Sequence, residues 1–432
     1  MPKRRRKRDG SATVRAETLS LRAVDGIVGG QAPWNGADRG WGNAAMTRDL
    51  LRLSRRGLLG ASGAAALAAP GLLRAQTKDP VRIGTAMPLT GAQAGYGNDF
   101  VTGMRMAVKD VNDAGGIAGR PVELVTLDTQ AEPQLGINAV NRLIGVEKMP
   151  MVLVAWSSVV KAVAPICNRE KVLEINTGAN SPEIATLGDY VYTAFPLAEV
   201  DITKLAQYVY QTLGKRRAAV LYINNDTGID AAKLYRDTFT KAGGQVVAFE
   251  AYDPKATEFT GMLLKTRAAN PDVVHLHGLT ADTPQVIAQM RQLGLTQQIT
   301  TYSAGYNPKL IEQCGPAAEG LIVTSLAPGV QENANVAPFL ERWKKEVGRV
   351  PNGLPYVQYQ YDMIPLAKAL YDHVDKKGQP ATGDTLRDAL VEIRTFDLPM
   401  TGKMVIDGHR VNKPVYLLTV KKGAFVPLAT LS

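Results

Sequence analysis

Two polar loops of the sequence carry residue types that could hold a small anion. Trp156-Ser157-Ser158 follows the apolar run 151–155, and the stretch Asn176-Thr177-Gly178-Ala179-Asn180-Ser181-Pro182-Glu183 follows the apolar run 172–176. Hydroxyl groups and unbonded N–H groups at a helix start favour a carboxylate, and the helix dipole adds to the attraction. Ser and Asn also cap helices that bind nothing. We favour ligand binding, because the two loops are expected on adjacent strands.

A glycine-rich turn, residues 88–97, lies between an expected strand and an expected helix, as phosphate-binding loops do. It lacks the Gly-Lys-Ser/Thr ending, and its glycines do not fit Gly-x-Gly-x-x-Gly. The turn is therefore expected to be either an ordinary tight turn or a loop that presents Tyr96 to a cleft.

His275 and His277 are two residues apart on an expected strand, so both would project from one face, which suits two metal ligands. No Cys, Asp or Glu lies beside them in the sequence. We therefore expect hydrogen-bonded residues near the cleft end of a buried strand, with no metal site.

No catalytic group emerges from the sequence. A Gly-x-Ser-x-Gly motif, which would mark a nucleophilic serine, is absent from residues 76–432. No carboxylate pair has an identifiable environment either. We expect neither an enzyme nor a bound cofactor.

The elements that must position these loops alternate in type. Short β-branched runs are separated by amphipathic stretches of helical period, which indicates parallel βαβ units. The rhythm restarts after Phe195-Pro196, so we expect two α/β lobes. The strands are expected at 81–87, 122–127, 151–155, 172–176, 218–223, 245–252, 273–276, 299–302, 321–326, 415–420 and 424–428.

This order of elements, together with several segments, resembles the periplasmic leucine/isoleucine/valine-binding protein family, the substrate-binding receptors of ABC importers. The similarity extends over residues 79–420. The resemblance implies an α/β type I periplasmic-binding fold, with two doubly wound parallel-sheet lobes joined by a three-strand hinge. The segments that carry it are 81–84, 88–91, Tyr96-Gly97, 110–120, Asp128, Ser157-Ser158, 181–183 and 318–323.

The resemblance also assigns site residues. It implies that Ser157, Gly178 and Asn180 hold the α-carboxylate of the ligand, while Tyr96 and Tyr361 line the cleft. The sequence departs from the family pattern at Asn180, which replaces a threonine, at Thr227, which replaces a cleft tyrosine, and near Ala304, where a glutamate normally pairs with the ligand's ammonium. The expected ligand-binding set is Tyr96, Trp156, Ser157, Ser158, Gly178, Ala179, Asn180, Thr227, Ala304 and Tyr361.

The missing glutamate leaves the ligand class open, because a buried ammonium without a carboxylate costs several kcal/mol. Either Asp226 replaces that glutamate or the ligand has no ammonium. The expected ligand is a branched-chain or other amino acid; the alternatives are an aromatic or aliphatic organic acid or amide, or a sensory role. The expected partners are a small solute and an ABC permease of the inner membrane, with no nucleic acid, and the protein is expected to be a monomer.

The charge of the chain is concentrated at its start. The net charge is +10, and residues 1–75 carry +9 of it, so the remainder offers no field for a polyanion. Residues 1–45 are expected to be a disordered leader, with Met46 as an alternative start. Residues 46–75 are expected to be a twin-arginine signal peptide around Arg55-Arg56, which directs the protein to the periplasm.

The lobes are expected to combine distant segments, with lobe 1 formed by 78–197 and 328–405, and lobe 2 by 198–327 and 406–432. The chain would cross between them near Pro196, Leu326 and Met404. Cys167 and Cys314 would then lie in different lobes, and we expect them to be unpaired thiols.

Overall fold

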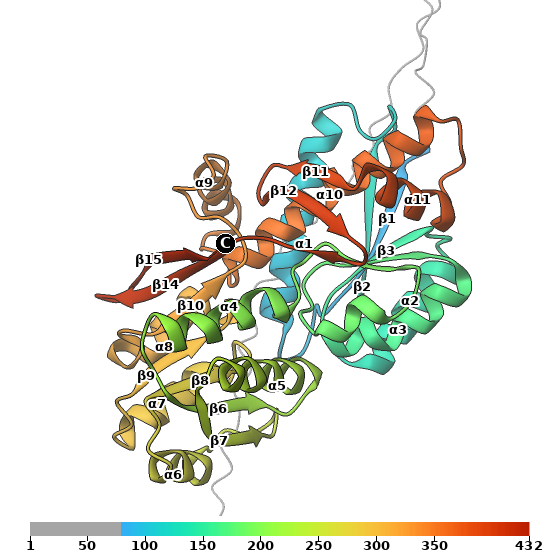
Figure 1. Cartoon of the computed structure of the whole chain (residues 1–432). Coiled ribbons are helices and arrows are strands. Elements are labelled where there is room, and N and C mark those ends of the chain that lie inside the picture. Colours follow the sequence, from blue (N-terminus) through green and yellow to red (C-terminus); the bar gives the residue numbers. More distant parts are fainter. Residues whose placement is uncertain (1–78, 432) are drawn as a thin grey trace, which may run out of the picture. The chain divides into compact units, whose positions relative to one another are not determined.

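A parallel five-stranded sheet forms the centre of the first lobe of the structure, a computed structural model that describes residues 79–431 (Figure 1). The predicted leader and signal peptide lie outside the described residues. The strand order is β2-β1-β3-β4-β5. The strands are β1 (Val81–Met87), β2 (Val122–Asp128), β3 (Met151–Val154), β4 (Leu173–Asn176) and β5 (Val191–Thr193).

The two faces of this sheet are covered by different helices. Alternate residues of β3 point to opposite faces, as strand geometry requires, so Val152 and Val154 belong to one hydrophobic cluster and Leu153 to another. Helices α2 (Pro133–Gly145) and α3 (Ser157–Glu170) cover the first face. Helices α1 (Ala94–Asp113) and α10 (Leu354–Lys376) cover the second.

The second lobe contains a seven-stranded sheet, with the order β15-β14-β10-β9-β8-β6-β7. Its strands are β6 (Arg217–Ile223), β7 (Gln245–Tyr252), β8 (Val273–His277), β9 (Gln298–Thr301), β10 (Ile322–Ser325), β14 (Val415–Lys421) and β15 (Ala424–Leu431). Its helices are α4 (Ala198–Gln211), α5 (Asp226–Lys241), α6 (Thr260–Ala268), α7 (Thr283–Gln292) and α8 (Pro308–Cys314), with the 3-10 helices η2 (Ser303–Gly305) and η3 (Gly315–Ala318).

The prediction of parallel sheets needs one qualification in this lobe. Strands β6 to β10 are parallel to one another. Strand β14 is antiparallel to β10, and β15 is antiparallel to β14. The reason for the pairing of β14 with β15 is their connection. Lys422 and Gly423 both have positive φ, as in the two-residue turns that join antiparallel hairpins. The predicted α/β fold of two doubly wound lobes is otherwise as expected.

Several smaller elements complete the described chain. Helix η1 (Pro182–Thr186) follows β4, while α9 (Val336–Val347) and α11 (Gly383–Ile393) flank α10 along the chain. A third sheet contains β11 (Thr395–Leu398), β12 (Gly402–Asp407) and β13 (Arg410–Val411). β13 contacts β5, and α11 contacts α10 and β4, so both belong with lobe 1. Neither α11 nor this sheet is anticipated by the sequence patterns.

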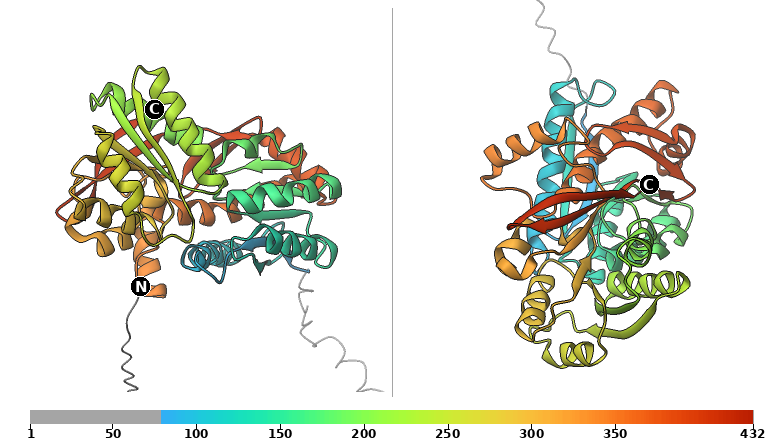
Figure 2. Two further views of the ribbon diagram at one scale, coloured as in Figure 1. Left: turned by 90° about the horizontal axis from the view of Figure 1, so that it is seen from below. Right: turned by 60° about the vertical axis from the view of Figure 1, so that its left-hand side comes forward.

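The chain passes between the two large sheets three times (Figure 2). Two passages follow β5 and β10, next to Pro196 and Leu326. The third leads from β13 to β14, at residues 412–414. The predicted boundary after residue 405 falls inside β12, which argues for moving it to 412–414.

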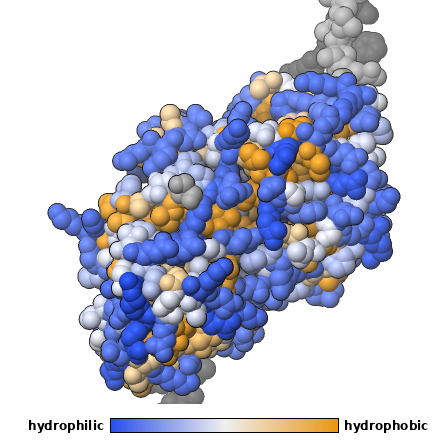
Figure 3. Space-filling model, viewed as in Figure 1, coloured by the Kyte–Doolittle hydropathy of each residue, from blue (hydrophilic) through white to orange (hydrophobic). Residues whose placement is uncertain are grey.

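Hydrophilic residues cover most of the face seen in Figure 1, with smaller hydrophobic areas between them (Figure 3). Cys167 and Cys314 are both buried and free, and they belong to separate hydrophobic clusters, one in each lobe. Among residues 79–431, no helix combines the length and the apolar character needed to cross a membrane.

Candidate functional site

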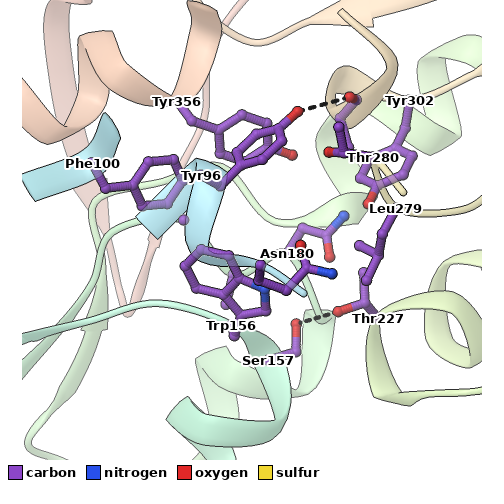
Figure 4. Close-up of a pocket in the computed structure, with 14 residues that line it drawn as sticks. Tyr96, Phe100, Trp156, Ser157, Asn180, Thr227, Leu279, Thr280, Tyr302 and Tyr356 are labelled. Atoms are coloured by element: carbon purple, nitrogen blue, oxygen red, sulfur yellow. Dashed lines mark hydrogen bonds between the residues drawn. The ribbon is translucent and has the colours of Figure 1, made fainter. Parts of the chain in front are cut away.

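A small cavity lies between the lobes, at the carboxyl ends of strands from both large sheets (Figure 4). Ligands of open α/β sheets bind at this edge. Its volume is about 40 Å³, room for roughly three water molecules. Its lining is uncharged and consists of Gln93, Tyr96, Phe100, Trp156, Ser157, Gly178, Ala179, Asn180, Thr227, Leu279, Thr280, Tyr302, Ala304 and Tyr356.

The start of α3 supplies the first group of donors. Trp156 precedes the helix with a φ of 70° and a ψ of 123°, a positive-φ conformation that a non-glycine residue rarely adopts and that often marks a functional site. This turn places Ser157 at the first helical position, where backbone N–H groups have no partner within the helix. Ser157 Oγ accepts from Ser181 N at 3.2 Å and from Thr227 Oγ1 at 3.1 Å. Its own hydroxyl hydrogen can therefore point to a solute.

The loop after β4 supplies a second donor. Asn180 is 4% exposed, and its Nδ2 has no hydrogen-bond partner among the described residues. Figure 4 shows its side chain between Trp156 and Thr227. A buried amide hydrogen without a partner costs free energy unless a solute accepts it.

Gly178 was predicted to hold the carboxylate, and Ala179 was included in the predicted ligand-binding set. In the structure, the backbone N–H groups of both residues have another partner. Their N–H groups donate to Asn176 Oδ1, at 3.1 and 2.7 Å, so the side chain of Asn176 already uses them. A Cβ at Gly178 would lie 3.1 Å from Phe100 Cε2, so glycine allows this ring to pack closely against the loop. Both residues line the cavity by their position.

Aromatic rings of lobe 1 form the largest wall of the cavity. The ring of Phe100 lies 5.3 Å from Trp156, 5.8 Å from Tyr356 and 6.0 Å from Tyr96 between centroids. The hydroxyl of Tyr96 donates to the carbonyl of Ala304 in lobe 2 at 3.0 Å. Burial raises the pKa of Tyr96 to about 12, so this hydroxyl stays protonated and keeps its donor.

Lobe 2 contributes a smaller wall, which includes Thr227, Leu279, Thr280, Tyr302 and Ala304. The ring of Tyr302 stacks on His277, with 3.8 Å between centroids. Figure 4 places Tyr302, Thr280 and Leu279 opposite the rings of lobe 1.

The two histidines behind this wall differ from the prediction. His275 Nδ1 lies 3.2 Å from Thr300 Oγ1, but neither ring nitrogen of His277 has a hydrogen-bond partner among the described residues. Burial lowers the pKa of His275 to about 3 and that of His277 well below its usual value, so both are neutral. Within residues 79–431, no group of three potential metal-ligating side chains comes together.

Two of the predicted residues lie elsewhere. Ser158 lines a neighbouring chamber of about 360 Å³, together with Asp226. Tyr361 faces away from the cavity and donates to Asp110 Oδ2 at 2.7 Å, while Arg342 pairs with the same carboxylate. Tyr356 takes its place at the cavity. Five residues of α-helix rotate a side chain by about 140°, so the two tyrosines face different sides of α10.

Asp226 was the candidate to replace the family's glutamate. It does not line the cavity, and its Oδ2 lies 3.9 Å from Lys161 Nζ. The cavity therefore offers no carboxylate to an ammonium group.

Sequence reasoning missed six lining residues, and three of them carried a usable signal. Leu279 and Thr280 follow β8, and Tyr302 follows β9, so the rule that selected Ser157 in lobe 1 would have selected them in lobe 2. The other three are Gln93, Phe100 and Tyr356.

Comparisons with known proteins agree with the fold. The sequence model of the periplasmic binding protein family matches residues 80–424. The leucine-specific-binding protein of Salmonella typhimurium is 25% identical over 289 residues, which cover 66% of this chain and 77% of the relative.

Solved structures show the same architecture. A leucine-binding protein from Thermotoga maritima superposes with a TM-score of 0.73 at 26% identity, covering 81% of this chain and 98% of its own. A solute-binding protein of an ABC transporter from Rhodopseudomonas palustris, in complex with 3,4-dihydroxybenzoic acid, gives 0.72 at 21% identity, with coverage of 82% and 98%. The chain therefore belongs to the periplasmic leucine-binding family, whose members bind small solutes and work with the permeases of ABC transporters.

Proposed function

We propose that this protein is the receptor of an ABC importer for a small carboxylate-bearing solute with a flat apolar body. The carboxylate would accept from Ser157, Asn180 Nδ2 and the first N–H groups of α3, and the body would lie against Tyr96, Phe100 and Tyr356. The observation that carries the proposal is the buried Nδ2 of Asn180, which has no partner among the described residues. It lies beside the start of α3, in an uncharged cavity with one wall of aromatic rings.

The absence of charge in the lining favours a solute without an ammonium group. The family resemblance puts the usual glutamate near Ala304, where this chain has no acid, and Asp226 lies by Lys161 outside the cavity. An ammonium buried there would lack a carboxylate, which costs several kcal/mol. An aromatic acid has the required carboxylate and flat body. The relative that holds 3,4-dihydroxybenzoic acid is similar in fold only.

A branched-chain amino acid is the second candidate, supported by the names of the relatives at 25–26% identity. Its ammonium would have to reach Asp226 in the neighbouring chamber, beyond Thr227 and Trp156, which line both spaces.

Titration calorimetry decides between the two. Residues 76–432 would be titrated with benzoate, 3,4-dihydroxybenzoate, L-leucine and L-isoleucine at one pH and salt concentration. We expect heat of binding with at least one aromatic acid and weaker or no binding of the amino acids. Binding of leucine alone would replace the first candidate by the second.

We also propose that the protein is exported by the twin-arginine signal at 46–75 and acts as a periplasmic monomer, with lobes divided near 197, 327 and 413. N-terminal sequencing of the exported form tests the signal: a start near Gln76 supports it, and a retained basic leader contradicts it. Light scattering measures the oligomeric state.

A further inference from the structure

A charged cluster outside the cavity joins the two lobes. Lys161 on α3 belongs to lobe 1, and its Nζ lies 2.6 Å from Glu183 Oε2 of η1 in the same lobe. The same Nζ reaches across to α5 of lobe 2, with 3.1 Å to Asp230 Oδ2 and 3.9 Å to Asp226 Oδ2. One ammonium thus lies among three carboxylates from both lobes.

The pair between the lobes is largely shielded from water. The side chains of Lys161 and Asp230 are 18% and 15% exposed. Burial alone would lower the pKa of Lys161, but its hydrogen bonds with Glu183 and Asp230 outweigh this and raise the pKa above its ordinary value. Lys161 is therefore charged, and its interactions are less weakened by salt than those of an exposed pair.

Hydrogen bonds connect this cluster to the cavity. Ser181 Oγ donates to Asp230 Oδ2, and Ser181 N donates to Ser157 Oγ at 3.2 Å. Ser157 Oγ also accepts from Thr227 Oγ1 of lobe 2. The lobe contact at Lys161 and the contact at the cavity are thus parts of one network, although Lys161 itself lies outside the cavity lining.

The charge balance shows why Lys161 matters for the contact between lobes. Glu183, Asp226 and Asp230 repel one another when they are brought together, and Lys161 offsets this repulsion. When the lobes separate, water solvates the carboxylates of α5, and the cation is no longer needed there. Removing Lys161 would leave the three carboxylates without a compensating charge when the lobes are closed, but not when they are separated.

We propose that Lys161 is a closure-determining residue, whose bridge to Asp230 sets the equilibrium between separated and closed lobes and thereby the affinity for every solute. The proposal rests on the function of a solute receptor given above. The apparent affinity of a solute that binds the closed form depends on the fraction of protein that is closed. A change in this fraction therefore alters the affinity for every solute by the same factor.

The test uses the Lys161→Met variant, with Lys161→Arg to retain the charge and Lys233→Met as the control for an exposed lysine of α5. Titration calorimetry would use benzoate and L-leucine, and stopped-flow measurements would give the dissociation rates. We expect Lys161→Met to weaken every probe that binds by the same factor of at least ten, equivalent to about 1.4 kcal/mol. Faster dissociation should account for the loss. Lys161→Arg should recover most of it, and Lys233→Met should bind as the unaltered protein does.

A probe-independent measurement separates this proposal from the choice of ligand. Small-angle X-ray scattering of the protein without solute would compare the radius of gyration of unaltered protein and Lys161→Met. A larger radius in the variant supports the closure-determining role even if neither probe binds, whereas absence of binding by the unaltered protein counts against the proposed ligand classes alone.

Equal radii together with unchanged affinity would overturn the role of Lys161, as would a loss confined to one probe. If Lys161→Met does not fold, as judged by circular dichroism, Asp230→Asn removes the bridge from the other lobe. We expect this variant to change radius and affinity in the same direction, by a smaller factor because Glu183 still pairs with Lys161.

Discussion

The two walls of the cavity are built differently. In lobe 1, the rings of Tyr96, Phe100, Trp156 and Tyr356 contact one another, and Asn176 holds the loop of Asn180. In lobe 2, the polar contacts of the wall reach across to lobe 1: Thr227 donates to Ser157, and Ala304 accepts from Tyr96. The first wall is assembled without the second. We therefore expect a solute to dock on lobe 1 and lobe 2 to cover it.

The largest effect should come from the donors of lobe 1. Ser157→Ala removes a hydroxyl that would donate to a charged carboxylate, and such bonds contribute about 1.5–3 kcal/mol. We expect affinity for the bound acid to fall at least tenfold in titration calorimetry. Ser158→Ala, in the neighbouring chamber, is the matched control and should change affinity by about twofold or less. Unchanged affinity in Ser157→Ala would remove lobe 1 as the docking wall.

The aromatic wall should give the next largest effect. Tyr356→Leu loses ring contacts worth about 0.5–1.5 kcal/mol, so we expect roughly fivefold weaker binding of an aromatic acid. Tyr361→Phe keeps the ring on the other side of α10 and removes the bond to Asp110. This control should bind normally and unfold at a slightly lower temperature. Weaker binding in Tyr361→Phe would restore the original assignment of that tyrosine.

A moderate effect is expected from the covering wall. Thr227→Val removes the hydroxyl that donates to Ser157, a neutral hydrogen bond worth about 0.5–1.5 kcal/mol. If lobe 2 only covers a docked solute, stopped-flow measurements should show about threefold faster dissociation and an unchanged association rate. Slower association would mean that lobe 2 takes part in the first encounter.

The smallest effect on binding is expected from a buried carboxyl of lobe 2 that lies outside the wall. Asp201 is fully buried and accepts from Thr324 Oγ1 at 2.7 Å, and burial raises its pKa from 3.8 to about 7. A raised pKa in the folded state means stability that is complete below about pH 4 and is lost as pH rises through 7.

Asp201→Asn keeps the shape and cannot ionise. We expect the variant and the unaltered protein to unfold at similar temperatures at pH 4, and the variant to be more stable at pH 8. Differential scanning calorimetry at both values checks this. Equal stability at both would show that Asp201 does not titrate in this range.

The sequence was most informative where topology alone decides position. Ser157 and Asn180 could be located because the carboxyl ends of adjacent parallel strands meet at one edge of a sheet. Thr227 and Ala304 came from the family resemblance, since nothing in their local pattern indicates a cleft. The rest depended on geometry that patterns do not encode. To choose between Tyr356 and Tyr361, one must know how α10 is rotated relative to the sheet. To recognise that the Gly178 N–H already has a partner, one must know the position of the Asn176 side chain.

The fold, like the site, was predictable only in part. Period and turn residues gave most strands of the two large sheets, but β11 to β13 were missed, although exposed and buried residues alternate in β11. The partners of Asp226 could not be read from the sequence either, because Lys161 is 65 residues away.

The position of Trp156 gives the protein a built-in optical probe. Residues 79–431 contain two tryptophans, and the other, Trp343, is fully buried on α9. Indole fluorescence responds to the polarity and quenching groups around the ring, and Trp156 lines the cavity. Tryptophan emission of the unlabelled protein should therefore change when the cavity is occupied. In residues 76–432, Trp343→Phe would leave a signal from the site alone.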